Sequence, residues 1–419
     1  MSVRPGWVDT LREAFGEALG ALEPGRLVAQ ALEDVPQVPG RVALLAVGKA
    51  AGAMTLGALG AMGSWGERVA EGLVVVPRLP EGLALGPKVE VRAAAHPVPD
   101  ERSVAAGELA LALAGRLKAG DLLLALVSGG ASALLAVPPA GVSLGEKQAL
   151  VSAMLDAGAP IQEVNLVRRH LSKVKGGRVA AAASPAVTFT LMMSDVIGGL
   201  PHDIGSGPTV PDPTCVDEAH AALLRWAPQF ARLAGALGES LDPASVRGLG
   251  AQQSRMLATP DALAEALAAA LEARGWAARV APAEAGEAEV VAARRVAQAS
   301  MLAPGEALVI ACEPTITLPA RRGEGGRAGW VALAALQRLP PDAALLCAAS
   351  DGVDGSSGAA GALVSGADAA RVSVGEIDAA LGRFDDGPLH RRLGTQLVGD
   401  PTGHNLSDVH AVVRGPPRR

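Results

Sequence analysis

The sequence has no tyrosine, four phenylalanines and five tryptophans, and only six of its 37 basic residues are lysines. Its formal net charge is −6. Nucleic-acid-binding domains usually carry a basic surface, and those that hold single strands add stacking aromatic side chains. The composition therefore excludes nucleic acid as a partner.

Cysteine is scarce as well. Cys215, Cys312 and Cys347 are widely spaced and form neither a disulfide framework nor a CxxC metal pair, which favours free thiols in a reducing cytoplasm. The acidic N-terminus lacks the apolar core of a signal peptide. Gly129, Gly130, Pro138 and Pro139 interrupt the uncharged stretch 122–145, so we expect no membrane span.

Apolar residues make up 49% of the 419 positions, enough for two folded domains. Apolar runs alternate with helical segments, a pattern that predicts α/β domains, each with a mostly parallel sheet flanked by helices. We predict a Rossmann-like domain over residues 1–240, a linker over 241–255 and a second α/β domain over 256–419. The extended segment 410–415 is expected to close a sheet or pack back on the first domain.

Two long helices are also predicted. Residues 7–33 alternate apolar and acidic positions at helical spacing. Residues 162–183 form a second helix, on which Arg168, Arg169, Lys173, Lys175 and Arg178 line one or two faces. Such a basic face is usually solvated, but it can also attract an acidic substrate.

The most informative stretch is SDVIGGLPHDIGSGPTVPDPT, residues 194–214, which follows an apolar strand at 187–193. An irregular loop of this length in a compact domain is usually functional or disordered. Four prolines stiffen it, and ligands of parallel sheets bind beyond the carboxyl ends of strands. We therefore interpret this loop as one wall of an active site.

Two glycine-rich loops follow other predicted strands. In AVGKAAGAM, residues 46–54, Lys49 stands at a helix start, where a cation and free N–H groups suit an anion. The loop departs from a Walker A motif. In LVSGGASALL, residues 126–135, successive small residues open a helix and can cradle a phosphate or carboxylate with backbone donors. A tight surface turn is the alternative interpretation of each loop.

Two further loops lie in the second half. In residues 349–362, Asp351 and Asp354 can hold Mg²⁺, or they can form Asx turns that cap the following helix. In RRGEGGRAGW, residues 321–330, Arg327 at a helix start can clamp a phosphoryl group, or it can belong to a solvated charge cluster. Phosphoryl transfer needs mainly positioning and neutralisation of charge, so this inventory indicates a phosphorylated or carboxylated small molecule.

The motifs VGKAAGAM, LVSGGASALL, EVNLVRRHLSKVKGGRVAA, SDVIGGLPHDIGSGPTVPDPT, SDGVDG and DPTGHNLSD occur in this order. Together they resemble the glycerate 2-kinase family with its MOFRL-type C-terminal domain, some members of which are labelled hydroxypyruvate reductase. The resemblance implies a cytoplasmic enzyme that uses ATP and Mg²⁺ to convert D-glycerate to 2-phosphoglycerate in a cleft between two domains. It leaves open whether the protein forms a homodimer.

The resemblance also implies roles for particular residues. Lys49, Asp195 and Arg327 would be catalytic residues. Lys49 and Arg327 would be the cations at the transferred phosphoryl group, and Asp195 would act as the base or as a metal-side carboxylate. Asp195, Asp351 and Asp354 would be the metal-side carboxylates. The substrate- and nucleotide-binding residues would be Ser128, Gly129, Gly130, Ser132, Asn165, Arg168, His202, Glu313, Asp351 and Asn405.

The second half departs from the family pattern. The family usually has GGET at residues 311–314 and GGRNQE at residues 325–330, where this chain has ACEP and GGRAGW. Two alternatives therefore stay open. One is a diverged kinase or binder of another hydroxy acid, and the other is a hydroxypyruvate reductase, although the chain has no GxGxxG dinucleotide fingerprint.

Overall fold

A computed structural model describes residues 5–61, 67–79, 85–242, 252–319, 321–399 and 401–416. Its contacts divide the chain into two compact units. The N-terminal unit contains Pro24–Ser194 and Gly199–Leu257, and the C-terminal unit contains Met1–Glu23, Asp195–Gly198 and Ala258–Arg419. These boundaries differ from the predicted ones, because the first residues and the short segment Asp195–Gly198 group with the C-terminal unit.

The N-terminal unit is built on a six-stranded sheet with the order β3-β2-β1-β4-β5-β6. Its strands are β1 (Val42–Val47), β2 (Val69–Val76), β3 (Val89–Ala93), β4 (Leu122–Ser128), β5 (Val187–Met193) and β6 (Gln252–Ala258). The pairs from β3 to β5 are all parallel. Every residue of β1 and β4 is buried, as expected for central strands covered on both faces.

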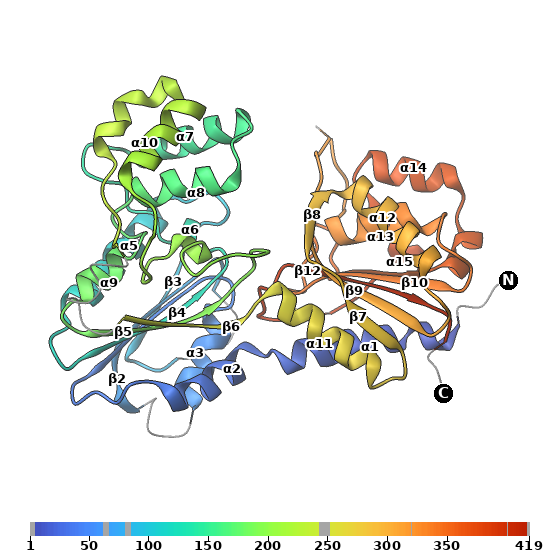
Figure 1. The fold of residues 1–419 in the computed structure, drawn as a ribbon, viewed down its shortest axis with the longest axis horizontal. Coiled ribbons are helices and arrows are strands. Elements are labelled where there is room, and N and C mark those ends of the chain that lie inside the picture. The colour runs from blue at the N-terminus through green and yellow to red at the C-terminus, as the bar shows by residue number, and fades with distance from the viewer. Residues whose placement is uncertain are drawn as a thin grey trace. The chain divides into compact units, whose positions relative to one another are not determined.

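Helices cover both faces of this sheet, and α2 and α3 lie on the face opposite α5 and α9 (Figure 1). The helices are α2 (Pro24–Ala31), α3 (Ala51–Gly60), α5 (Glu101–Gly115), α6 (Ala131–Leu134), α7 (Leu144–Asp156), α8 (Ile161–His170), α9 (Arg178–Ala183) and α10 (Val216–Trp226), with 3-10 turns η2 (Leu32–Asp34), η3 (Ile204–Ser206) and η4 (Pro228–Ala236). Helices α7, α8 and α10 stand apart from the sheet around a small apolar core of their own, which includes Leu150, Val167 and Leu223.

The C-terminal unit has a second six-stranded sheet. Its strands are β7 (Ala277–Val280), β8 (Glu284–Glu287), β9 (Glu306–Thr315), β10 (Ala343–Ala349), β11 (Gly361–Ser365) and β12 (Asp408–Arg414). The order is β11-β10-β12-β9-β7, and β8 also pairs with β9. Because β12 is antiparallel to both β9 and β10, four strands run in one direction and β11 and β12 run in the other.

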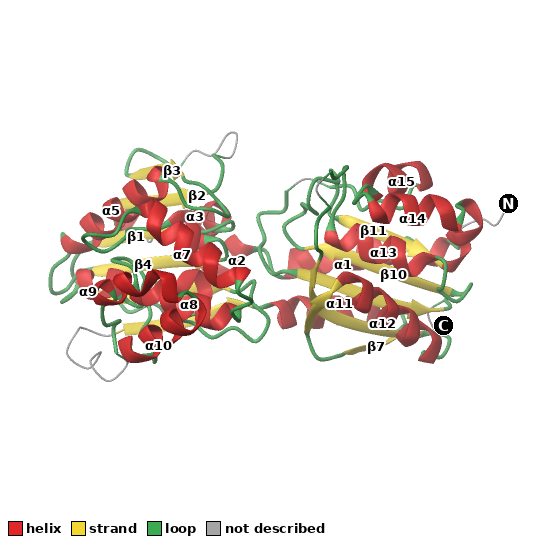
Figure 2. Cartoon of the chain, turned by 90° about the horizontal axis from the view of Figure 1, so that it is seen from above, coloured by secondary structure: helices red, strands yellow, loops and turns green. Residues whose placement is uncertain are grey.

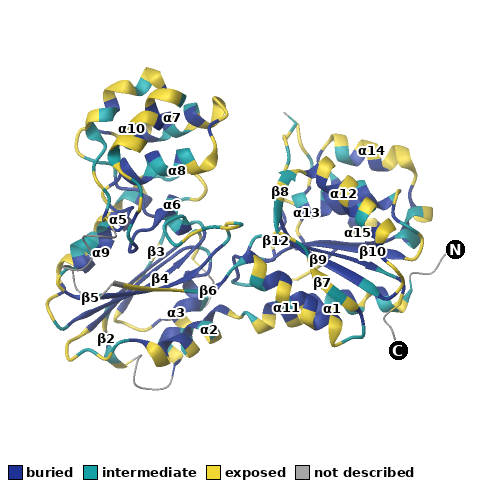
Figure 3. Ribbon diagram, in the orientation of Figure 1, coloured by how far each residue is buried: buried dark blue, intermediate teal, exposed yellow. Residues whose placement is uncertain are grey.

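Helices α1 and α11 lie on one face of the second sheet, and α12 to α15 lie on the other (Figures 1 and 2). These elements are α1 (Thr10–Ala21), α11 (Pro260–Glu272), α12 (Ala288–Met301), α13 (Arg327–Leu336), α14 (Val374–Gly382) and α15 (Asp386–Leu393), with 3-10 turns η1 (Gly6–Val8) and η6 (Gly366–Arg371). In both units the central strands are buried, whereas edge strands such as β3 and β7 and the outer helix surfaces are partly exposed (Figure 3). The α/β class predicted from the sequence is confirmed.

Several local predictions need correction. The helix expected over 7–33 is two helices, because the chain turns at Leu22 and α2 begins at Pro24, a residue suited to a first helical turn. The segment 410–415 does enter a sheet, but as β12 between β9 and β10 in the C-terminal unit. None of the described helices is long and apolar enough to cross a membrane.

Candidate functional site

Two turns meet where the strand order of the N-terminal sheet reverses. They are the Lys49 turn (residues 48–50), which follows β1, and the SGGAS turn (residues 128–132), which follows β4. The N–H of Lys49 donates to the Gly129 carbonyl over 3.0 Å, and the N–H of Ala50 donates to Ser128 Oγ over 3.0 Å. Open α/β sheets bind ligands beyond the strand ends at such a switch point. This junction is therefore the candidate site of the N-terminal unit.

The side chains of Lys49 and His96 lie against the SGGAS turn. A Cβ atom on Gly130 would lie 3.1 Å from His96 Cδ2 and 3.5 Å from Lys49 Cγ. Lys49 is half-buried, whereas Ser128 is fully buried beneath the two turns. The structure thus brings together Lys49, Gly129 and Gly130, three of the residues named as site candidates, and Ser128 acts as an internal link between the turns.

Ser132 joins the SGGAS turn to the loop at 194–214. The hydroxyls of Ser132 and Ser206 are 2.9 Å apart, and Ala131 packs closely against Gly205, where a Cβ atom would lie 2.6 Å from Ala131 Cβ. The N–H groups of Gly176 and Gly177 donate to the carbonyls of Ser206 and Gly207 over 3.0 and 2.7 Å. Backbone hydrogen bonds therefore hold the loop against the segment 171–177.

The same contacts explain why the long helix predicted over 162–183 is wrong. It is two helices, α8 and α9, because the segment 171–177 leaves the helix, and Gly176 and Gly177 both have positive φ. The five basic residues predicted on this helix therefore do not form one solvated face. Arg169 is buried and its Nε donates to Asp212 over 2.9 Å, Lys175 is buried, and Lys173 is exposed.

The other predicted binding residues of this unit are half-buried. Arg168 donates from a terminal guanidinium nitrogen to Asn165 Oδ1 over 3.2 Å on α8. His202 Nε2 is 3.8 Å from Asp203 Oδ1, and burial lowers the pKa of His202 below its ordinary value even with that carboxylate beside it. These three side chains keep polar groups accessible in the same unit as Lys49.

In the C-terminal unit, Asp195 and Asn405 are in direct contact. Asn405 Nδ2 donates to Asp195 Oδ2 over 2.9 Å, across 210 residues of sequence. Asn405 is buried and Asp195 is half-buried. The hydrogen bond fixes the carboxylate through one oxygen and leaves Oδ1 without a partner among the described residues.

Arg327 is the first residue of α13, and its guanidinium is 3.4 Å from Asp408 Oδ1 at the start of β12. Burial lowers the pKa of Arg327, but the carboxylates of Asp408, Glu313, Asp354 and Asp351 outweigh burial and raise that pKa above its ordinary value. Burial raises the pKa of Asp408 to about 7 in spite of Arg327. The structure thus brings Arg327, Glu313, Asp351 and Asp354 into one charged cluster and adds Asp408.

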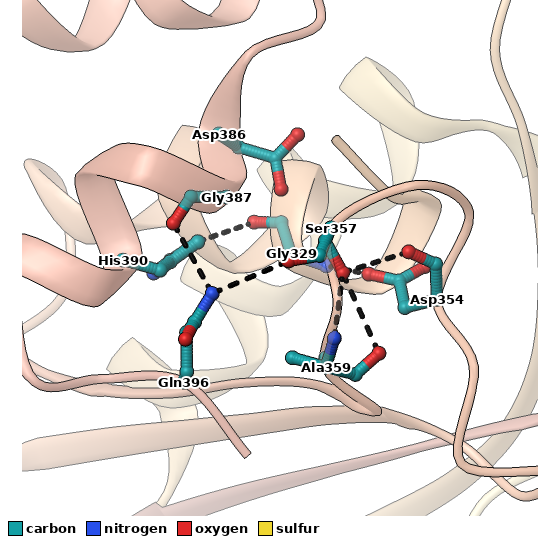
Figure 4. Close-up of a pocket in the computed structure, with 9 residues that line it drawn as sticks. Gly329, Asp354, Ser357, Ala359, Asp386, Gly387, His390 and Gln396 are labelled. Carbon is teal, nitrogen blue, oxygen red and sulfur yellow. Dashed lines mark hydrogen bonds between the residues drawn. The ribbon is translucent and has the colours of Figure 1, made fainter. Parts of the chain in front are cut away.

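Two carboxylates occupy the backbone donors at the start of α13. Asp354 accepts from the N–H groups of Ala328 and Gly329 over 3.1 and 2.8 Å, and Asp386 accepts from Gly326 over 3.3 Å. Both carboxylates border a small polar pocket that His390 and Gln396 also line (Figure 4). An anion at this helix end would therefore depend on the Arg327 side chain, because the N–H groups are already used.

The same geometry bears on the predicted metal carboxylates. Asp351 Oδ1 accepts from the N–H of Val353 over 3.0 Å, which is an Asx turn, and Asp354 caps α13. Within the described residues no group of three or more His, Cys, Asp or Glu side chains could hold a metal ion. A Mg²⁺ ion here would therefore rely on phosphate and water for most of its ligands, as Mg²⁺ usually does.

Three residues were missed by the sequence analysis: His96, Asp386 and Asp408. Asp408 is the last residue of the DPTGHNLSD motif and stands at the start of an apolar strand. This position could have marked it as a candidate site residue. His96 follows β3 at a strand end, which is also recognisable. Asp386 gives no such signal, because its burial depends on the packing of α15 against α13.

The fold and these polar clusters define a two-unit α/β protein with an anion-suited switch point in one unit and an arginine–carboxylate cluster in the other. Two family models match the chain: "Domain of unknown function (DUF4147)" over residues 10–237, and the MOFRL family over residues 306–408.

Individual relatives match over nearly the whole length. A glycerate 2-kinase of Pyrococcus horikoshii is 30% identical, with 94% of each chain covered. A protein of Agrobacterium vitis named "Putative hydroxypyruvate reductase" is 36% identical over 97% of this chain and 94% of its own. The crystal structure of a glycerate kinase from Thermotoga maritima superposes with a TM-score of 0.84 at 29% identity, covering 97% of this chain and 99% of that one. The chain belongs to the MOFRL-type glycerate 2-kinase family.

We predict that Gly48→Ala destabilises the N-terminal unit. Gly48 has φ of +129°, and a Cβ there would lie 2.1 Å from Ser128 Oγ. Backbone strain and overpacking together should cost about 2 kcal/mol or more in the free energy of unfolding, measured by urea denaturation. Gly60→Ala, where a Cβ meets nothing within 4 Å, is the matched control and should be nearly neutral. Equal effects of the two substitutions would contradict this account.

We predict that Asp386→Asn flattens the pH dependence of stability. Burial, followed by the charge of Asp354, raises the pKa of Asp386 to about 8, and Asp386 Oδ2 is buried without a hydrogen-bond partner among the described residues. Because the folded state holds this proton more tightly, wild-type stability should fall as pH rises from about 4 to about 8.

At about pH 9 the Asn variant should be more stable than wild type by about 2 kcal/mol, the usual scale for relieving an unsatisfied buried group. At about pH 4 the difference should be small. The exposed Asp378→Asn is the control. A variant that loses stability with pH as steeply as wild type would show that Asp386 is not the titrating group.

Proposed function

We propose that this protein phosphorylates D-glycerate at its 2-hydroxyl group, with ATP as the phosphoryl donor and Mg²⁺ as the metal. Full-length relatives named glycerate 2-kinase support this proposal. The observation that carries it is the Asn405–Asp195 hydrogen bond. It joins two of the family motifs, SDVIGGLPHDIGSGPTVPDPT and DPTGHNLSD, in the same unit as Arg327 and Asp408.

In the proposed reaction, Asp195 accepts the proton of the 2-hydroxyl as its oxygen attacks the γ-phosphorus and the bond to the ADP oxygen breaks. The structure supports this role because Asn405 holds Oδ2 and leaves Oδ1 to accept the proton. Lys49 and Arg327 would neutralise charge that develops on the transferred group. Asp408 would hold the Arg327 guanidinium through their 3.4 Å contact.

The described residues fit a magnesium–nucleotide complex that needs few protein ligands. Asp351 is a half-buried carboxylate that could supply one ligand, and Asp195, also half-buried, would supply a second only if it acted at the metal instead of as the base. Asp354 fits less well, because both its oxygens accept backbone hydrogen bonds. When bound, Mg²⁺ would neutralise phosphate charge.

A coupled assay of ADP release from ATP with D-glycerate tests the proposal. We expect ADP release that depends on both D-glycerate and Mg²⁺. A parallel assay follows NADH oxidation with hydroxypyruvate, the reaction suggested by the name of the Agrobacterium relative. Reductase activity without ADP release would refute the kinase proposal.

Replacing Lys49 with Ala should lower kcat roughly 100-fold or more, the scale of losing one preorganised electrostatic donor. The half-buried side chain lies against the SGGAS turn rather than in the core, so the melting temperature should change little. Lys118→Ala, an exposed lysine of the same unit, is the matched control. Near-normal turnover of the Lys49 variant would remove Lys49 from the mechanism.

A further inference from the structure

Lys175 is a buried lysine whose ammonium group is fully coordinated by the SGGAS turn and its helix. Only 2% of the residue is exposed. Its Nζ donates to the Ser132 carbonyl over 2.5 Å, to Ser132 Oγ over 3.1 Å and to the Leu135 carbonyl over 2.9 Å. Three oxygens match the three N–H donors of an ammonium group.

These contacts stabilise a helix too short to stabilise itself. Helix α6 has four residues, so most of its carbonyls have no partner within the helix. A cation at a helix C-terminus satisfies such carbonyls and complements their partial negative charge. Lys175 supplies this cation and thereby fixes the conformation of the SGGAS turn.

Lys175 also connects the SGGAS turn to the loop at 194–214. Ser132 Oγ, which accepts from Lys175, lies 2.9 Å from Ser206 Oγ. The next residue, Gly176, donates its N–H to the Ser206 carbonyl. One lysine and its neighbour thus set the relative position of the SGGAS turn and the loop at 194–214.

The charge of Lys175 is not balanced by a carboxylate. Within the described part of the chain, no acidic side chain lies within ion-pair distance of Lys147, Arg168 or Lys175. Burial lowers the pKa of Lys175 well below its ordinary value, and repulsion from Lys147 and Arg168 lowers it further. A buried cation without a counter-ion is costly. An anion bound at the SGGAS turn would supply the missing negative charge.

We propose that Lys175 is a positioning residue that holds the SGGAS turn in the conformation that binds an anionic group of the substrate, a carboxylate or a phosphate. It acts through Ser132 and the Leu135 carbonyl just after α6, because its own three donors are already used. This inference rests on the proposed function for the identity of the two ligands, D-glycerate and ATP. Each carries one of the two anionic groups.

The test is calorimetric titration of the full chain with D-glycerate and, separately, with ATP. In Lys175→Met, we expect the affinity for one of these ligands to fall roughly 10-fold or more, the usual effect of losing charged hydrogen bonds. The affected ligand identifies which anion binds at the turn. Lys173→Met, the same change at an exposed position two residues away, should leave both affinities unchanged.

A second variant guards against simple loss of folding. Ser132→Ala keeps the lysine and removes one of its three acceptors. It should lower the affinity for the same ligand. Adding Lys175→Met to a folded Ser132→Ala protein should lower that affinity by a smaller factor than Lys175→Met does in the wild-type protein. Amide hydrogen exchange should rise over residues 128–136 in Lys175→Met and stay unchanged in Lys173→Met.

Binding is measured without turnover, so the two proposals can fail separately. A wild-type protein that binds D-glycerate or ATP but makes no phosphorylated product would refute the kinase function alone. Folded Lys175→Met or Ser132→Ala protein with both affinities within about twofold of wild type would overturn the role of Lys175. Wild-type protein that binds neither ligand would overturn it as well.

Discussion

The hydrogen-bonded junction of the Lys49 turn and the SGGAS turn is the constraint on which the N-terminal site depends. Parallel pairing of β1 and β4 brings the two strand ends to one level, with Val47 opposite Val127. Ser128 Oγ then accepts from Ala50, and Gly129 accepts from Lys49. Only glycine fits at position 48, because a side chain would enter Ser128. The strand order of the sheet thus dictates where the cation and the glycine-rich turn meet.

The C-terminal unit is shaped by the negative charge of its buried carboxylates. It buries several carboxylates around the start of α13, where backbone N–H groups can hold two of them. Arg327 compensates part of the remaining negative charge through Asp408. The consequence is a cation held in place by acidic neighbours, which is suited to meet a phosphoryl group. The Asn405–Asp195 contact adds an oriented carboxylate to the same unit.

The sequence predicted the α/β class and the glycine-rich loops at strand ends, because strand ends and glycine turns are local signals. That the Lys49 and SGGAS turns meet is a tertiary contact that only the structure reveals. It could not show that the helix over 162–183 breaks, since the break depends on Gly176 and Gly177 pairing with a loop about 30 residues later. The burial of Lys175, Asp386 and Asp408 was hidden for the same reason. A charged residue in a sequence is expected to be solvated, and only tertiary contacts show that it is buried. The residues at 311–330 that differ from the family pattern likewise do not predict the carboxylates packed at the start of α13.

Identification of the phosphorylated carbon by NMR tests the central claim most directly. The full-length protein would be incubated with D-glycerate, ATP and Mg²⁺, and the product examined by phosphorus–proton correlation. The account predicts a phosphorus coupled to the single proton on C2, as in 2-phosphoglycerate. Coupling to the two protons on C3, or no phosphorylated glycerate in the presence of folded protein, would contradict it.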